Sequence, residues 1–142
     1  MSVSTTPHLN FRGQAREALE FYRSVFGGDL SIATYSDMRS AEEAGQAGHV
    51  AFGRVDAPNG LHLMAYDVQP SNGYDPGENP FYVTLQGTEG DEIQPLWDAL
   101  AGSATTILVP LAPAPFAPLY GMVTDRFGVT WIVGADTAPN ED

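Results

Sequence analysis

The sequence predicts an α+β protein made of two βαβββ modules. Two segments, AREALEFYRSVFG and DEIQPLWDALAG, carry apolar residues at helical spacing. Each segment follows a short strand-like run, and three β-rich stretches follow each of them. The two segments also superimpose at a fixed offset of 74 residues, which places Leu19 on Ile93. Because the helices, the strands and their order agree, we predict a structural repeat rather than a coincidence between two amphipathic helices.

The first module, residues 7–67, begins with the strand-like run HLNF. Its helix ends at Gly27 and Gly28, as helices with a glycine C-cap do. Three predicted strands then complete the module, with the sequences LSIATYS, HVAFGRV and LHLMAYD.

The second module, residues 80–134, repeats this order from FYVTL onward. Its helix carries Pro95 near the first turn, where proline is tolerated. The predicted strands after the helix are TTILVPL, LYGMVTD and VTWIV. We predict that a linker, residues 68–79, joins the modules within one domain of residues 1–142, and that the polar tail, residues 135–142, is frayed.

Two hairpin turns that end in glycine, DAPNG and TDRFG, strengthen the repeat. When these glycines are aligned, Met64 falls opposite Ile132. The hairpins therefore agree with the interpretation of the chain as strand, helix and three strands, done twice.

The second turn leads into the stretch DRFGVTWIV, which has two possible roles: the last strand of a sheet or the last arm of a metal site. We expect Asp125 to hold the turn through a side chain to backbone hydrogen bond rather than to act as a catalytic acid. Gly128 is expected to adopt a positive φ, and Trp131 to pack under the helix.

Each predicted helix can cover only one face of its small sheet. The other face must curl around a ligand, pair with the second module or pair with another chain. We therefore predict a cupped mixed sheet with a cleft, completed by a homodimer.

Composition narrows the classes of partner. The formal net charge is -12, and all six basic residues are Arg. Such a chain repels phosphate backbones and lacks a polybasic patch, so we expect neither a nucleic acid nor a membrane partner. There is no Cys, which excludes disulfides and thiolate metal sites. With no apolar run of spanning length and no signal peptide, the predicted location is cytoplasmic.

The segments NFRGQAREALEFYRSVFGG and VTDRFGVTWIV resemble the vicinal oxygen chelate superfamily, which includes glyoxalase I and bleomycin-resistance proteins. The closer resemblance is to its PhnB-like subgroup, also labelled 3-demethylubiquinone-9 3-methyltransferase-like. The residues that match the subgroup's opening and closing motifs are Phe11, Gly13, Glu17, Ala18, Phe21, Tyr22, Phe26, Gly27 and Gly28, then Asp125, Phe127, Gly128 and Trp131. The resemblance covers nearly the whole chain and implies a glyoxalase-like fold, but it says little about activity.

Metal-dependent members of this superfamily hold a divalent ion with His, Glu or Gln side chains from four strands. The resemblance places these positions at Pro7, Met64, Tyr82 and Ile132. None of the four is a good ligand for such an ion, so we predict a protein without a bound metal or another cofactor.

The histidines leave one alternative open. His62 has the same strand parity as Met64 and is the titrating group expected in the cleft. His8 is expected on the helix side or in solvent, and His49 opens a strand. A shifted metal site made of His49, His62 and Glu78 is the alternative arrangement.

Strand parity and a proline-rich loop, residues 111–121, give the predicted lining of the cleft. The alternative for these side chains is an ordinary core. The residues expected to bind ligand are Phe11, His62, Met64, Tyr66, Tyr82, Thr84, Phe116, Tyr120 and Ile132.

Four functions remain open at this point. The favoured one is a metal-free protein that binds a small molecule, aromatic or cationic, in the manner of drug-sequestering members. The alternative is a metal-dependent lyase, isomerase or dioxygenase that uses shifted ligands. A methyltransferase would need a cofactor loop that the sequence does not show. A structural dimer without a ligand is the fourth.

Overall fold

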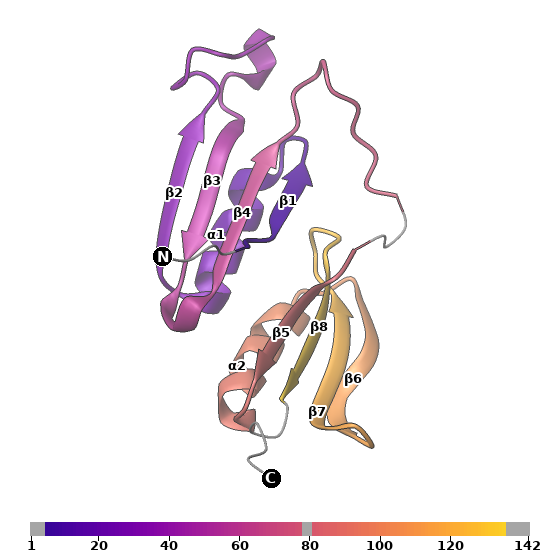
Figure 1. The fold of residues 1–142 in the computed structure, drawn as a ribbon. Coiled ribbons are helices and arrows are strands. Elements are labelled where there is room, and N and C mark those ends of the chain that lie inside the picture. Colours follow the sequence, from indigo (N-terminus) through magenta and orange to yellow (C-terminus); the bar gives the residue numbers. More distant parts are fainter. Residues whose placement is uncertain (1–4, 78–80, 136–142) are drawn as a thin grey trace. The chain divides into compact units, whose positions relative to one another are not determined.

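A computed structural model describes residues 5–77 and 81–135 of the chain. It confirms the α+β class and the order strand, helix and three strands, repeated once. The chain divides into two compact units, residues 1–76 and 77–142. Each unit contains one mixed four-stranded sheet with a helix against one of its faces (Figure 1).

In the first unit the strand order is β1-β4-β3-β2, with β1 parallel to β4 and the other neighbours antiparallel. The elements are β1 (His8–Phe11), α1 (Ala15–Phe26), β2 (Asp29–Thr34), β3 (Val50–Asp56) and β4 (His62–Asp67). Short 3-10 turns, Ala44–Gln46 and Pro58–Gly60, lie in the loops before and after β3.

The second unit repeats this topology with the order β5-β8-β7-β6, in which β5 is parallel to β8. Its elements are β5 (Val83–Gly87), α2 (Gly90–Ala101), β6 (Thr106–Ala114), β7 (Ala117–Thr124) and β8 (Thr130–Ala135). No helix in the part of the chain that the structure describes has the length and hydropathy needed to cross a membrane.

The core of each unit lies between the helix and the sheet face that it covers, because apolar residues recur every three or four positions along the helix. In the first unit the buried apolar residues of helix and sheet include Ala18, Leu19, Tyr22, Val55, Leu63 and Ala65. In the second unit they include Ile93, Trp97, Leu100, Val123, Trp131 and Val133. Alternate strand residues therefore face the helix, and their neighbours face the opposite side.

A buried carboxylate ties the first unit together. Asp67, the last residue of β4, is 1% exposed. Its Oδ1 accepts hydrogen bonds from the backbone N–H groups of Gly13 at 2.6 Å and Ala15 at 3.1 Å, and its Oδ2 accepts one from Val50 at 2.9 Å. Gly13 and Ala15 flank the start of α1, so the carboxylate occupies the amide groups at the positive end of this helix. The Tyr35 hydroxyl donates to the Asp67 carbonyl oxygen at 2.6 Å, and burial raises the pKa of Tyr35.

Asp125 plays the turn-forming role predicted for it. Its Oδ1 accepts the backbone N–H groups of Phe127 at 2.8 Å and Val129 at 3.1 Å, and its Oδ2 accepts the indole N–H of Trp131 at 2.8 Å. Gly128 has a φ of 90°, and Trp131 is 1% exposed. The stretch DRFGVTWIV is therefore a hairpin turn followed by a buried strand.

Two details of the predicted repeat were wrong. The helices Ala15–Phe26 and Gly90–Ala101 are offset by 75 residues, not 74. For the first strands the offset is 76, because His8 pairs with Met64 as Thr84 pairs with Ile132. The offset changes because the segments that join equivalent elements differ in length. Pro95 also lies in the second turn of α2, since the helix begins at Gly90.

Candidate functional site

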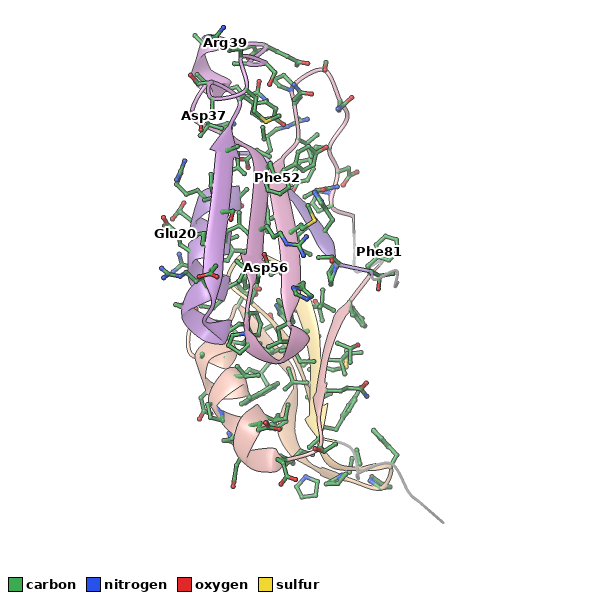
Figure 2. The ribbon with its side chains drawn as sticks, turned by 60° about the vertical axis from the view of Figure 1, so that its left-hand side comes forward. Glu20, Asp37, Arg39, Phe52, Asp56 and Phe81 are labelled. Carbon is green, nitrogen blue, oxygen red and sulfur yellow. The ribbon has the colours of Figure 1, made fainter. Side chains whose placement is uncertain are left out.

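The side of each sheet opposite its helix is named here the open face. In the first unit, strand pairing brings together side chains from all four strands on this face. The pairs and rows fixed by the register are Asp29, Asp56 and His62; then Ser31, Arg54, Met64 and His8; then Ala33 with Phe52, and Tyr66 with Asn10. The structure thus places His62, Met64 and Tyr66 on one face. Figure 2 labels Phe52 and Asp56 along β3, and Glu20 on helix α1.

Phe11 lies on the other side of this sheet, so its expected position in a cleft was wrong. It is 3% exposed and pairs with Asp67, whose carboxylate lies at the start of α1. His8 and Asn10 face the open side in its place, and the His8 ring lies 5.1 Å from the Tyr66 ring in an edge-on arrangement. The physical reason is that a strand covered on one face buries its apolar residues under the helix, and in β1 those residues are Leu9 and Phe11.

In the second unit, the open face carries Thr84, Ile132 and Tyr120. Thr84 pairs with Ile132, and Tyr120 pairs with Gly134 in the same sheet. Phe116 lies at the tip of the β6–β7 hairpin, is 70% exposed, and its ring lies 4.9 Å from that of Tyr120. Tyr82 precedes β5 and is 43% exposed. The predicted site residues of this unit are therefore accessible aromatic and apolar groups, with one threonine hydroxyl.

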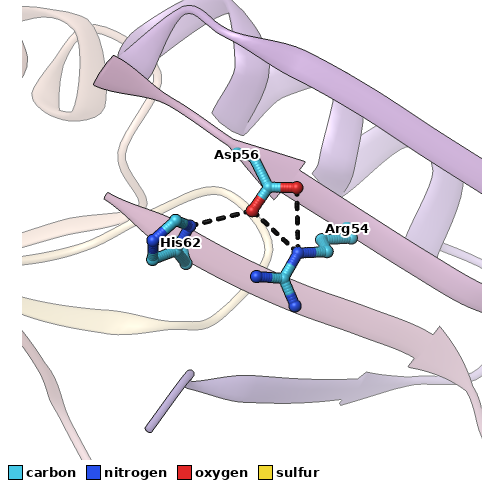
Figure 3. Close-up of polar contacts among 3 residues, drawn as sticks. All are labelled: Arg54, Asp56 and His62. Atoms are coloured by element: carbon cyan, nitrogen blue, oxygen red, sulfur yellow. Dashed lines mark hydrogen bonds and ion pairs between the residues drawn. The ribbon is translucent and has the colours of Figure 1, made fainter. Parts of the chain in front are cut away.

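A charged cluster on the open face of the first unit was not predicted. Asp56 contacts the Arg54 Nε with both carboxylate oxygens, at 2.7 and 2.9 Å, and its Oδ1 lies 2.8 Å from the His62 Nδ1 (Figure 3). Hydrogen bonds from Arg54, and then from His62, hold the pKa of Asp56 below its usual range. The sequence contained a signal for this cluster. Arg54 and Asp56 alternate along a strand, and the DAPNG hairpin brings Asp56 opposite His62.

Replacing Arg54 with glutamine is expected to raise the pKa of Asp56 toward its ordinary value of 3.8, because the largest cause of the lowering is removed. In the native protein, the cluster stabilises the fold fully at pH values above the ordinary pKa of Asp56. This stabilisation is lost as the pH falls through the lower pKa of Asp56 in the folded state. Carboxyl-carbon NMR titration of both proteins measures the change. Asp37 is the internal reference, since the Thr34 backbone N–H and hydroxyl lower its pKa independently of Arg54. An unchanged Asp56 midpoint would contradict the geometry of the cluster.

Comparison with known proteins identifies the family. The model of the 3-demethylubiquinone-9 3-methyltransferase family matches residues 3–134. The chain belongs to this family. The match confirms the predicted 3-demethylubiquinone-9 3-methyltransferase-like assignment. No curated protein matches the chain.

Solved structures agree with the family assignment. A Pseudomonas aeruginosa protein is 32% identical, with a TM-score of 0.81, and the match covers 96% of this chain and 100% of that one. The PhnB protein of Bacillus cereus is 28% identical, with a TM-score of 0.69 and coverage of 94% and 99%. A glyoxylase/bleomycin resistance protein/dioxygenase domain from Frankia shares the fold, with a TM-score of 0.67 at 11% identity over 99% and 96% of the two chains.

In this 3-demethylubiquinone-9 3-methyltransferase family member, the residues at and beside the positions expected for metal ligands do not make a complete set of good donors. The parallel registers place His8, not Pro7, beside Met64, and Thr84, not Tyr82, beside Ile132. Pro7 and Tyr82 each lie directly before the first residue of their strands, β1 and β5. One imidazole, a thioether, a hydroxyl and a hydrocarbon do not form the His, Glu and Gln set that suits a divalent ion. Within residues 5–77 and 81–135, no group of three or more His, Asp or Glu side chains could hold a metal.

The shifted metal site of His49, His62 and Glu78 is also not supported by the fold. His62 pairs with Asp56 at one end of β3, whereas His49 precedes Val50 at the other end. This strand spans 7 residues, or roughly 23 Å at the rise of an extended chain. The two imidazoles therefore cannot share one ion, and Glu78 lies outside the described residues.

Proposed function

We propose that this family member is a small-molecule binding protein of the glyoxalase/bleomycin-resistance type, which binds its ligand without a metal. The observation that carries this proposal is the chemistry of the open faces. Each sheet is covered on one face by the helix of its own unit, and the opposite face carries aromatic side chains, among them Phe52, which is 41% exposed, and Tyr120. Aromatic and apolar walls with few polar groups are typical of small-molecule sites.

A ligand with an aromatic or apolar group fits these side chains. Phe52, Met64 and Tyr66 offer such a surface in the first unit, and Tyr120 and Phe116 offer one in the second. We expect a homodimer, because a sheet face without a helix is stabilised when a partner or a ligand covers it. We also expect a cytoplasmic location.

A methyltransferase activity receives less support than binding. Cofactors that resemble nucleotides are commonly held at the first strand–helix turn, where glycines and helix amides meet the ligand. In this chain the amides of Gly13 and Ala15 at that turn are hydrogen-bonded to the buried Asp67 carboxylate. That anion-binding position is therefore already occupied by the protein itself.

Thermal unfolding with a panel of aromatic compounds, and separately with Zn, Ni, Mn and Fe(II), tests the proposal. A compound present at about ten times its Kd stabilises the native state by about 1.4 kcal/mol. For a domain of this size, that stabilisation raises Tm by about 4 °C. We expect such a rise with at least one aromatic compound and none with a metal. A stoichiometric metal in the purified protein, or a rise in Tm specific to one metal, would refute metal-free binding.

A further inference from the structure

We propose that the open face of the first unit recognises a carboxylate on an aromatic ligand, with the Arg54 guanidinium as the group that binds it. This inference rests on the proposed binding function and names the chemical class of the ligand. It draws on the position of Arg54, on the groups that orient it, and on the apolar side chains beside it.

Arg54 lies near the centre of the open face. It is on β3, between Ser31 of β2 and Met64 of β4, and its side chain is 33% exposed. Its Nε donates to Asp56, whereas neither Nη atom makes a hydrogen bond to any residue in the described ranges 5–77 and 81–135. The two Nη atoms present planar N–H donors, which match the two oxygens of a carboxylate.

The guanidinium is oriented by a chain of two contacts. Asp56 fixes the Nε, and His62 contacts the same carboxylate oxygen at 2.8 Å from the paired position on β4 (Figure 3). Because Asp56 approaches through Nε, it leaves the far edge of the guanidinium to a ligand. Asp56 and His62 are therefore positioning residues in this proposal.

The surroundings favour an aromatic rather than a small inorganic anion. Phe52 lies two residues before Arg54 on the same face of β3, and Met64 lies directly across from Arg54. A flat apolar group can contact these side chains while its carboxylate meets Arg54. The other titratable groups on the face are Asp29 next to Asp56, His8 next to Met64, and Tyr66 next to Asn10.

The net charge of -12 does not oppose this choice of ligand. Exposed charges act through salt solution over a screening length of about 8 Å, whereas hydrogen-bonded contacts are screened much less. The acidic surface lowers the association rate of anions. The direct contact with Arg54 then determines which ligand is stabilised once it is bound. Asp29 and Asp56 weaken the attraction for an anion, so we expect low affinity for a minimal probe.

NMR titrations of the full chain with benzoate, benzamide and benzylamine test the proposal at low salt. These probes share a ring and differ in charge. We expect benzoate to shift the amide signals around Phe52, Arg54 and Met64 in a saturable way, and to bind more tightly than benzamide or benzylamine. In the Arg54→Gln variant, the affinity for benzoate is expected to fall about tenfold, the loss typical of one charged hydrogen-bonded contact.

Arg16→Gln is the matched control, because it removes the same charge from an exposed position on α1, on the other side of the sheet. It is expected to keep the native affinity for benzoate. An amide spectrum with the native pattern shows that each variant is folded. Equal binding of the three probes, or undiminished benzoate binding by Arg54→Gln, would overturn the carboxylate inference and leave the proposed binding function standing. Absence of binding by all three probes would overturn the inference and also count against the open face of the first unit as a binding surface.

Discussion

Replacing Asp67 with alanine is expected to lower the free energy of unfolding of the first unit by about 3–5 kcal/mol. The substitution leaves three backbone donors without their acceptor: the buried amides of Ala15 and Val50, and the part-buried amide of Gly13. Each unsatisfied donor costs about 1–3 kcal/mol, and the helix also loses a negative charge at its positive end. Urea unfolding followed by far-ultraviolet circular dichroism measures the change.

The chain offers an internal reference and a matched control for this experiment. Both tryptophans, Trp97 and Trp131, lie in the second unit, so their fluorescence reports on the unfolding of that unit. Asp98→Ala removes a carboxylate from an exposed position on α2 and is expected to change stability by less than about 0.5 kcal/mol. If Asp67→Ala lowered the free energy of unfolding no more than Asp98→Ala does, the Asp67 carboxylate would not stabilise the start of α1 in solution.

The second large effect is expected from Gly28→Ala, at about 2–6 kcal/mol of lost stability. Gly28 has a φ of 90°, and a Cβ atom there would overlap the backbone of Asp56 and Ala57 at the end of β3. Backbone strain of this kind costs about 1–3 kcal/mol, and overpacking costs a similar amount. Since the neighbouring atoms are backbone, no side-chain rotation can relieve the overlap. Chemical denaturation of the variant measures the loss.

Gly27→Ala separates the two contributions. Gly27 has a φ of 78°, but a Cβ atom at this position meets nothing within 4 Å. This variant should therefore show the cost of strain without the overlap, about 1–3 kcal/mol. Equal losses from Gly27→Ala and Gly28→Ala would show that the segment after α1 and the end of β3 do not approach as closely as the structure indicates.

The features that the sequence predicted well depend on residues that are close in the chain. The turn at Asp125 was predicted correctly because its bonds to Phe127, Val129 and Trp131 reach no more than 6 residues along the chain. Helix amphipathicity and glycine turns are local in the same way, so the order of elements and the βαβββ repeat followed from them.

The features that were missed depend on which strands become neighbours. Phe11 was expected in a cleft because its alternation with Asn10 shows that two faces exist but not which one the helix covers. The contact between Asp56 and His62 requires the β3–β4 register, and the role of Asp67 requires β1, α1 and β3 to meet at one point. Open-face residues such as Met64 and Ile132 could be assigned to a face, but their role as ligand contacts remains a prediction.

The two buried carboxylates imply different timing when the chain folds. Asp125 bonds within one hairpin and can close its turn as soon as that hairpin has been synthesised. Asp67 bonds to amides 54, 52 and 17 residues earlier in the chain. The start of α1 is therefore stabilised only after the last strand of its unit has formed. Closing the chain between Gly13 and Asp67 costs conformational entropy before these hydrogen bonds can form. A nascent chain that stops before residue 67 lacks the acceptor for these amides, so we expect the first unit to become stable in one late step.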